Sequence, residues 1–191
     1  MDRSTDTPGP SDRAAGPGRR GGRCSSLARE RERLGLLLDP EEAARAAGAR
    51  VVVGVDEAGR GALAGPVYAA AVVLAAGVPV PGLDDSKALS AEVREALAPR
   101  IRRDASSWGV GSASAAEIDA LGIAPATFLA MRRAIESVEA RGAAPDLVLV
   151  DGFPIPALGV PQRAVVRGDA TVACIAAASV LAKTARDEAL R

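Results

Sequence analysis

The chain contains no histidine among its 191 residues, and this absence excludes several kinds of chemistry. A Ser-His-Asp triad, a Cys-His pair, a histidine-ligated zinc site and an imidazole proton shuttle all require that side chain. Cys24 and Cys174 are the only cysteines, too few for a four-cysteine zinc site or a disulfide framework. Any catalysis therefore has to use carboxylates, lysine, arginine, hydroxyl groups or a bound metal ion.

Aromatic residues and lysines are also scarce. With one Trp, one Tyr and two Phe, a core drawn from the 48% hydrophobic residues must consist mainly of Ala, Val, Leu and Ile. Lys87 and Lys183 are the only lysines, and every other basic residue is arginine. The formal net charge of zero gives no overall attraction to nucleic acid or membrane, although it is compatible with a local basic strip.

Long hydrophobic runs are absent as well. The longest ones, at 67–76 and 172–182, are too short to span a bilayer. Residues 1–23 lack the apolar segment of a signal peptide. We therefore expect a soluble, cytoplasmic protein without a membrane partner.

Composition divides the chain into three parts. Residues 1–23 are rich in Pro, Gly, Ser and Arg and have no apolar periodicity, which predicts a disordered N-terminal tail. Residues 24–48 predict a helical lead-in of two short helices, in which Asp39 caps the second helix and Gly48 ends it. Residues 49–191 hold the predicted strands and helices of one α/β domain.

Residues 49–191 show both strand and helix patterns. Short apolar runs predict strands at 51–55, 67–74, 108–113, 147–150 and 163–167. Helices are predicted from Asp85 or Ser86 to about 103, with Pro99 bending or ending the last turn, and at 115–121, 125–141 and 171–190. Strands come first in a meander and then alternate with helices, which indicates an α/β fold with a mixed sheet. Cys174, in the last helix, is expected to be buried as a small hydrophobe.

Acidic residues follow three of the predicted buried strands. Asp56 and Glu57 follow VVVGV, Asp151 follows LVLV, and Asp169 follows AVVRG. A carboxylate at the end of a buried strand places a costly charge at the edge of the core. Each acid taken alone is equally well explained as a loop cap or an ion-pair partner, but packing hardly explains the set.

Four carboxylates would converge if these strands are neighbours. Like charges a few ångströms apart repel strongly, and two divalent cations would balance them. Ligation by oxygen alone favours Mg²⁺ or Mn²⁺ over zinc. A two-metal carboxylate site is suited to phosphodiester hydrolysis, which needs no histidine.

A glycine-rich loop follows the first two acids. Glycines let the backbone approach a ligand closely, and Arg60 lies between Gly59 and Gly61. Exposed amides together with a guanidinium form a cradle for a phosphate or a sugar.

The segment GVDEAGRGALAGPVYAAAVVL resembles the opening motif of the ribonuclease HII (type 2 ribonuclease H) family. The resemblance continues in order through LDDSKALS, IDALGIAPATFLAMRRAI, LVLVDG and RGDATVACIAAASVLAKTARDEAL. It covers about residues 50–190. The resemblance implies a ribonuclease H-like fold, with a mixed five-stranded sheet flanked by helices.

The same resemblance implies an activity, namely a metal-dependent endoribonuclease that uses Mg²⁺ or Mn²⁺, two ions during catalysis. Such an enzyme hydrolyses the RNA strand of RNA–DNA hybrids and incises 5′ of ribonucleotides embedded in duplex DNA, in DNA replication and repair. It is expected to act as a monomer. The family's catalytic and metal-binding acids correspond to the strand-end acids: Asp56, Glu57, Asp151 and Asp169. The family's element that contacts the 2′-hydroxyl and adjoining phosphate corresponds to Gly59, Arg60 and Gly61.

Both lysines also fall within matched motifs. Lys87 and Lys183 are expected to contact the nucleic-acid backbone or to support the acids. The alternative for Lys183 is a surface ion pair with Asp187, four residues further along the same predicted helix.

The C-terminus departs from the family pattern. Family members usually continue into a segment with a tyrosine that stacks beside the ribonucleotide, whereas this chain stops at Arg191 and its only tyrosine is Tyr68. We therefore expect a catalytic domain that is shortened at its C-terminus. A catalytically impaired hybrid-binding protein is the main alternative, and another metal-dependent phosphodiesterase or phosphatase is a third possibility.

Overall fold

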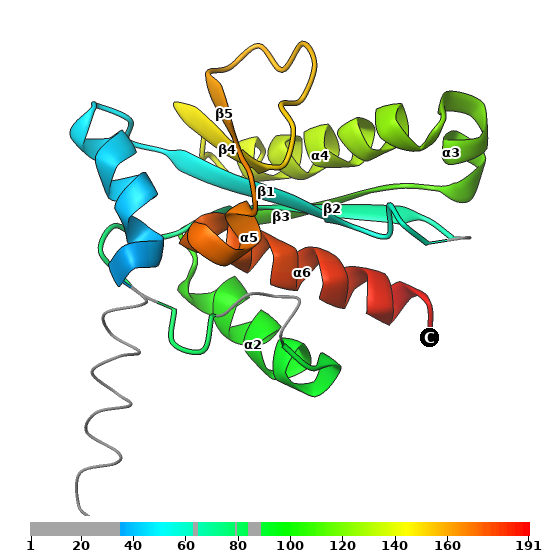
Figure 1. Ribbon diagram of the computed structural model, residues 1–191, viewed down its shortest axis with the longest axis horizontal. Helices are drawn as coiled ribbons and strands as arrows, with labels where there is room; N and C mark the ends of the chain where they lie inside the picture. Colours follow the sequence, from blue (N-terminus) through cyan, green and yellow to red (C-terminus); the bar gives the residue numbers. More distant parts are fainter. Residues whose placement is uncertain (1–34, 63–64, 79, 84–88) are drawn as a thin grey trace, which may run out of the picture.

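The computed structural model describes residues 35–62, 65–78, 80–83 and 89–191 (Figure 1). The predicted tail, Lys87 and the two predicted helix caps at positions 85 and 86 lie outside the described residues. The boundaries of the tail and of the lead-in therefore stay predictions. None of the described helices combines the length and the apolar character that crossing a bilayer requires.

Among the described residues, strands form one mixed sheet, which confirms the predicted fold class. The strands are β1 (Val52–Ala58), β2 (Val67–Val73), β3 (Ser107–Ala113), β4 (Leu147–Asp151) and β5 (Gln162–Val165). Their order is β3-β2-β1-β4-β5, with antiparallel pairing from β3 to β1 and parallel pairing from β1 to β5. Each strand begins within one residue of its predicted start, and β1 lies at the centre.

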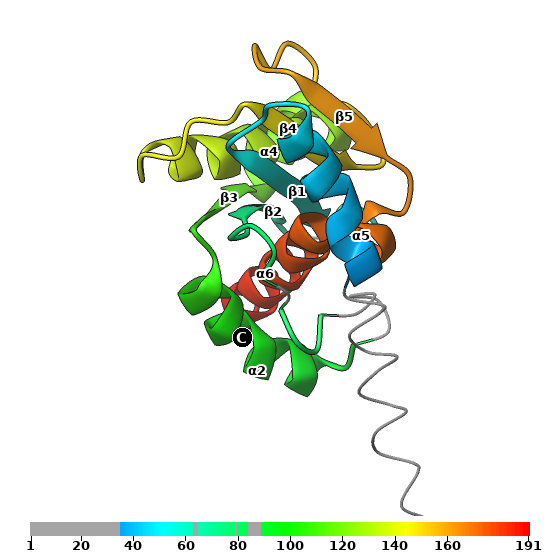
Figure 2. The ribbon, with the colours of Figure 1, turned by 90° about the vertical axis from the view of Figure 1, so that its left-hand side faces the viewer.

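Helices cover both faces of the sheet. They are α2 (Ala91–Asp104), α3 (Ala115–Leu121), α4 (Ile123–Glu139), α5 (Gly168–Thr171), α6 (Ala173–Ala189) and a helix at 35–46. Figures 1 and 2 show α4 on one face of the sheet and α6 on the other, with α2 on the side of α6 that faces away from the sheet.

Alternate residues of β1 divide the core into two layers. Val53 and Val55 belong to the apolar cluster under α4, whereas Val52 belongs to the cluster under α6. Small residues allow close packing, because a Cβ on Gly54 would lie 2.3 Å from the backbone carbonyl carbon of Cys174 in α6. Packing through Gly and Ala explains how a chain with so few aromatic residues builds a core.

The start of α2 differs from the prediction, whereas its end at Asp104 lies within one residue of the predicted end. Ser90 caps the helix, rather than Asp85 or Ser86, and its hydroxyl accepts a hydrogen bond from an amide of the first turn. Pro99 lies inside the helix, which continues to Asp104. Buried apolar residues on both sides of Pro99 anchor the turn that the proline weakens.

The lead-in is also organised differently. The helix at 35–46 passes through Asp39 and Pro40 without a break, so Asp39 is not an N-cap. Burial of Leu37 and Leu38 against the α6 side of the core anchors the turn before Pro40. The predicted stop at Gly48 is confirmed, since its N–H bonds back to a carbonyl of the last turn at 2.9 Å.

The predicted helix at 171–190 is two helices. Val172 has an extended backbone, with φ −133° and ψ 121°, and it separates α5 from α6. Cys174 is fully buried in α6, as expected. The break places Asp169 in a helix of its own, α5.

Candidate active site

Asp56 and Glu57 lie inside β1 rather than after it. The strand continues to Ala58, and it pairs Asp56 with Ala70 and Glu57 with Ala69 of β2. Adjacent residues of a strand point to opposite faces, so Asp56 faces α6 and Glu57 faces the α4 side. Asp56 is only 5% exposed. The two side chains therefore leave the strand on opposite faces of the sheet.

Asp151 lies beside Asp56. It is the last residue of β4, and the parallel register pairs Val55 with Val150, one residue before each acid. Asp151 Oδ1 accepts a hydrogen bond from Gly168 N at 2.7 Å, which links the end of β4 to the start of α5. Neighbouring strands thus bring these two carboxylates together.

Asp169 lies in α5 rather than at the end of a strand. β5 ends at Val165, and Asp169 is in the first turn of α5, where it is 2% exposed. The expected strand-end position is therefore wrong. The chain still brings Asp169 close to Asp151, because the preceding residue, Gly168, donates the hydrogen bond to Asp151.

The pKa of Asp56 is raised to about 7. Burial is the largest cause, because it removes the water that stabilises the charge, and the carboxylates of Glu57 and Asp151 raise the pKa further. Two donors oppose this rise: the Ser179 hydroxyl of α6, and the Glu57 N–H at 2.7 Å from Asp56 Oδ1. A nearby cation would stabilise the ionised form of such a buried acid.

The donor set fits a hard divalent cation, because Mg²⁺ and Mn²⁺ prefer carboxylate oxygens. However, no group of three or more acidic, cysteine or histidine side chains in the described part of the chain is placed to hold a metal ion. Glu57 points to the other face of the sheet, and Asp169 belongs to α5. The strand register places Asp56 and Asp151 side by side, and the convergence of all four carboxylates stays a prediction.

The Gly-Arg-Gly element forms a turn after β1. Gly59 has φ 99°, and a Cβ there would lie 2.5 Å from Arg186 Nε, so glycine is required. A Cβ on Gly61 would have no atom within 4 Å, which shows open space at this position. Arg60 is 43% exposed, and its Nη1 lies 3.8 Å from Glu57 Oε1. The guanidinium is thus beside Glu57 and accessible.

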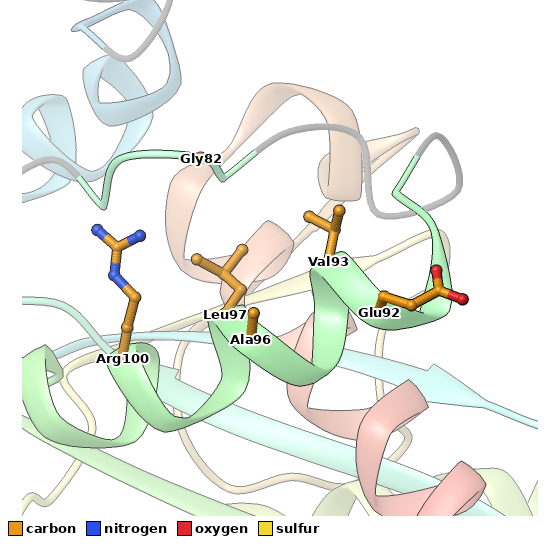
Figure 3. Close-up of a pocket in the computed structure, with 6 residues that line it drawn as sticks. All are labelled: Gly82, Glu92, Val93, Ala96, Leu97 and Arg100. Atoms are coloured by element: carbon orange, nitrogen blue, oxygen red, sulfur yellow. The ribbon is translucent and has the colours of Figure 1, made fainter.

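Two of the surface pockets bear on where the site lies. One of about 270 Å³ adjoins the turn and is lined by Gly59, Ala62, Gly65, Ala115, Ile118, Asp119 and Ile123. Another of about 330 Å³ lies along α2 and is lined by Gly82, Glu92, Val93, Ala96, Leu97 and Arg100 (Figure 3). The α2 pocket includes none of the predicted site residues, so the carboxylates and the turn define the candidate site.

Lys183 lies on α6, one turn after Ser179, and therefore on the same side of the helix. It is half-buried. Asp187, its predicted ion-pair partner, accepts a hydrogen bond from Arg94 Nη2 at 3.2 Å. The position of Lys183 is compatible with support of the acids.

The sequence model of the ribonuclease HII family matches residues 53–191, a range that includes every residue of the candidate site. This chain belongs to the ribonuclease HII family. It is 53% identical over 159 residues to ribonuclease HII of Ralstonia pickettii, covering 83% of this chain and 68% of the relative. It is 57% identical over 137 residues to ribonuclease HII of Cupriavidus metallidurans, covering 72% and 61%. The chain thus spans 68% and 61% of the lengths of these curated relatives.

Solved structures of ribonucleases H confirm the ribonuclease H-like fold. Ribonuclease H2 of Pyrococcus horikoshii matches with a TM-score of 0.63 and 25% identity, over 73% of this chain and 74% of that chain. Ribonuclease HII of Archaeoglobus fulgidus, solved in complex with PCNA, matches with a TM-score of 0.60 and 28% identity over the same shares.

Two residues near the acids were not found from the sequence. Ser179 is fully buried, and its hydroxyl forms a hydrogen bond with Asp56. It carries the only hydroxyl in the apolar run 172–182, and this isolated polar position could have identified it from the sequence. Phe153 lies two residues after Asp151 and is 63% exposed. Its exposure is not visible in any local sequence pattern.

Proposed function

We propose that this member of the ribonuclease HII family is a metal-dependent endoribonuclease that hydrolyses the RNA strand of RNA–DNA hybrids. We further propose that it incises 5′ of ribonucleotides embedded in duplex DNA, as a cytoplasmic monomer in DNA replication and repair. The observation that carries the proposal is the buried Asp56 carboxylate beside Asp151, in a chain of this family. Folding alone gives no reason to bury a carboxylate beside a second one, whereas a catalytic site does.

The metal ligands proposed are Asp56, Glu57, Asp151 and Asp169, for Mg²⁺ or Mn²⁺, with two ions during catalysis. Bound ions of this kind supply a hydroxide nucleophile and stabilise the leaving oxygen. The protein's own contribution is orientation. Ser179 and the Glu57 N–H hold Asp56, and the Gly168 N–H holds one oxygen of Asp151.

Substrate contacts are assigned to the turn after β1. Arg60 presents an exposed guanidinium beside Glu57, and a guanidinium pairs well with a phosphate. Gly59, with its positive φ, shapes the turn, and the open space at Gly61 leaves the backbone accessible to the 2′-hydroxyl, the group that distinguishes RNA from DNA at a single position. Lys87 and Lys183 are proposed to bind the nucleic-acid backbone.

The test is incubation with a DNA duplex that contains one ribonucleotide, in Mg²⁺ or Mn²⁺. The expected result is a single incision 5′ of the ribonucleotide that leaves a 3′-hydroxyl and a 5′-phosphate, and no cleavage of the matching all-DNA duplex. Asp56→Asn should lower kcat by at least about 100-fold, because it removes a charge from the reacting site. Asp39→Asn makes the same chemical change at an exposed position of the 35–46 helix and should leave kcat unchanged.

A hybrid-binding protein without turnover is the second candidate. Folded protein that binds hybrids in a salt-dependent manner but never cleaves them would support this candidate against the first. Equal cleavage of the all-DNA duplex would instead indicate a general metal-dependent phosphodiesterase.

A further inference from the structure

Two large apolar side chains are exposed at the carboxyl ends of β4 and β5. Phe153 is 63% exposed and Val166 is 80% exposed. The chain segments that carry them are adjacent, because Asp151 pairs with Val165 and Gly152 N donates to Val165 O at 3.0 Å. Both apolar side chains therefore lie next to the carboxyl end of β4, where Asp151 is located.

Two cations accompany these apolar side chains. The Arg60 guanidinium lies 5.9 Å from the centre of the Phe153 ring, within the range of a cation–π contact. Arg167 follows Val166 and has the left-handed φ of 57°, an uncommon conformation for a residue other than glycine. The next residue, Gly168, donates its N–H to Asp151. We call Arg60, Phe153, Val166 and Arg167 the rim.

An aromatic ring and guanidinium groups beside carboxylates match the chemistry of a nucleic-acid strand. Single exposed apolar residues are normal on protein surfaces, so exposure alone carries no argument. Here the ring belongs to one of only four aromatic residues in the chain, and it lies two residues from Asp151. Proteins bind nucleic-acid strands by stacking bases on aromatic rings and by pairing phosphates with arginine.

We propose that Phe153 stacks against a base or sugar of the strand that enters the acid site, while Arg60 and Arg167 contact its phosphates. This inference rests on the proposed function, because it assumes a nucleic-acid substrate. Phe153 is then a substrate-binding residue. It acts on affinity, because its ring can touch the strand without touching the bond that is cleaved.

The test compares Phe153→Ala, Phe153→Leu and Phe153→Tyr with the wild type on a duplex that contains one ribonucleotide. Phe153→Ala should raise KM about 5- to 100-fold, the effect of losing one stacked base, with kcat within about twofold. Phe153→Tyr keeps the ring and should restore KM. Phe153→Leu keeps apolar area without a π face and should stay weak.

Leu36→Ala is the matched control. Leu36 is also 63% exposed, but it lies in the helix at 35–46, outside the rim, so KM should not change. A fluorescent base analogue beside the ribonucleotide adds a spectroscopic signature, since stacking quenches its emission. Quenching is expected with the wild type and Phe153→Tyr, and its loss is expected with Phe153→Ala.

Two outcomes overturn the inference: an unchanged KM and unchanged quenching in Phe153→Ala, or full recovery in Phe153→Leu. Failure of the proposed function is recognised separately, as absence of cleavage by the wild type. In that case equilibrium binding of the same duplex still decides the role of Phe153. Equal dissociation constants for the wild type and Phe153→Ala would reject a stacking role for Phe153. A Kd that is about 5- to 100-fold higher for Phe153→Ala would support that role.

Discussion

Asp56 is a carboxylate whose charge is disfavoured by its own surroundings, and Ser179 is the side chain that opposes this effect. Asp56 is 5% exposed and Ser179 is fully buried, so water cannot replace either partner. The Ser179 hydroxyl lowers the pKa of Asp56, whereas burial and the neighbouring carboxylates raise it. Ser179 therefore helps to keep Asp56 ionised, which is the form that binds a cation.

Ser179→Ala should reduce both activity and stability. A hydrogen bond to a charged group contributes about 1.5–3 kcal/mol, so kcat should fall about tenfold or more. Thr184→Val is the control, because Thr184 is buried in the same helix and its hydroxyl donates to Val180 O at 2.8 Å rather than to an acid. Steady-state cleavage and urea unfolding measure both effects. Equal losses of activity in the two variants would contradict a specific role for Ser179.

At the scale of elements, a side chain of the helix at 35–46 caps the N-terminus of α6. The residue before α6 offers no side-chain cap, and Glu41 Oε1 accepts a hydrogen bond from Cys174 N at 2.7 Å. Arg45 Nη2 lies 3.6 Å from Glu41 Oε2 and donates to Leu74 O at 3.0 Å. A carboxylate at a helix N-terminus is favoured by the helix dipole. The lead-in thus fixes the helix that carries Ser179.

Stability should depend on pH through Glu41. Burial raises its pKa above the usual value of 4.5, although the Cys174 N–H and Arg45 act in the opposite direction. Where the folded state still holds the proton and the unfolded state has lost it, stability falls as pH rises. The contribution should be complete below the usual pKa and should be lost as pH rises through the raised one.

Glu41→Gln, which stays neutral, should remove this part of the pH dependence. Urea unfolding of the wild type and of the variant, measured between about pH 4 and pH 8, gives the difference that isolates Glu41. Glu42→Gln changes an exposed neighbour in the same helix and should leave the slope as in the wild type. If the free energy of unfolding varied with pH in the same way for the wild type and Glu41→Gln, the pKa of Glu41 would be the same in the folded and unfolded states.

The sequence predicted elements well where local pattern decides them. The apolar runs of β1 and β4 gave starts within one residue, because burial of both faces of a strand requires that pattern. Tertiary contacts decided the rest. Pro99 stays inside α2 because flanking residues are buried, and the break at Val172 accompanies the contact of Glu41 with Cys174, which is distant in sequence.

At the scale of the whole molecule, the site was predictable in part. Acids after buried strands singled out Asp56 and Asp151, and the parallel register of β1 with β4 makes them neighbours. The separation of Glu57 from Asp56 follows from strand alternation, once β1 is known to continue through both. The exposure of Phe153 depends on the path of the β4–β5 connection, which has no local sequence pattern.

The folded molecule keeps like charges together in its interior, and its stability should therefore respond to divalent cations. A ligand that binds only the folded state, at 100 times its Kd, stabilises that state by about 2.7 kcal/mol, which raises Tm by several degrees. Thermal unfolding with and without Mg²⁺ or Mn²⁺ measures this rise independently of activity. Asp151→Asn should abolish it, whereas Asp39→Asn, an exposed acid, should preserve it. An equal rise in Asp151→Asn would place the cation away from the Asp56–Asp151 pair.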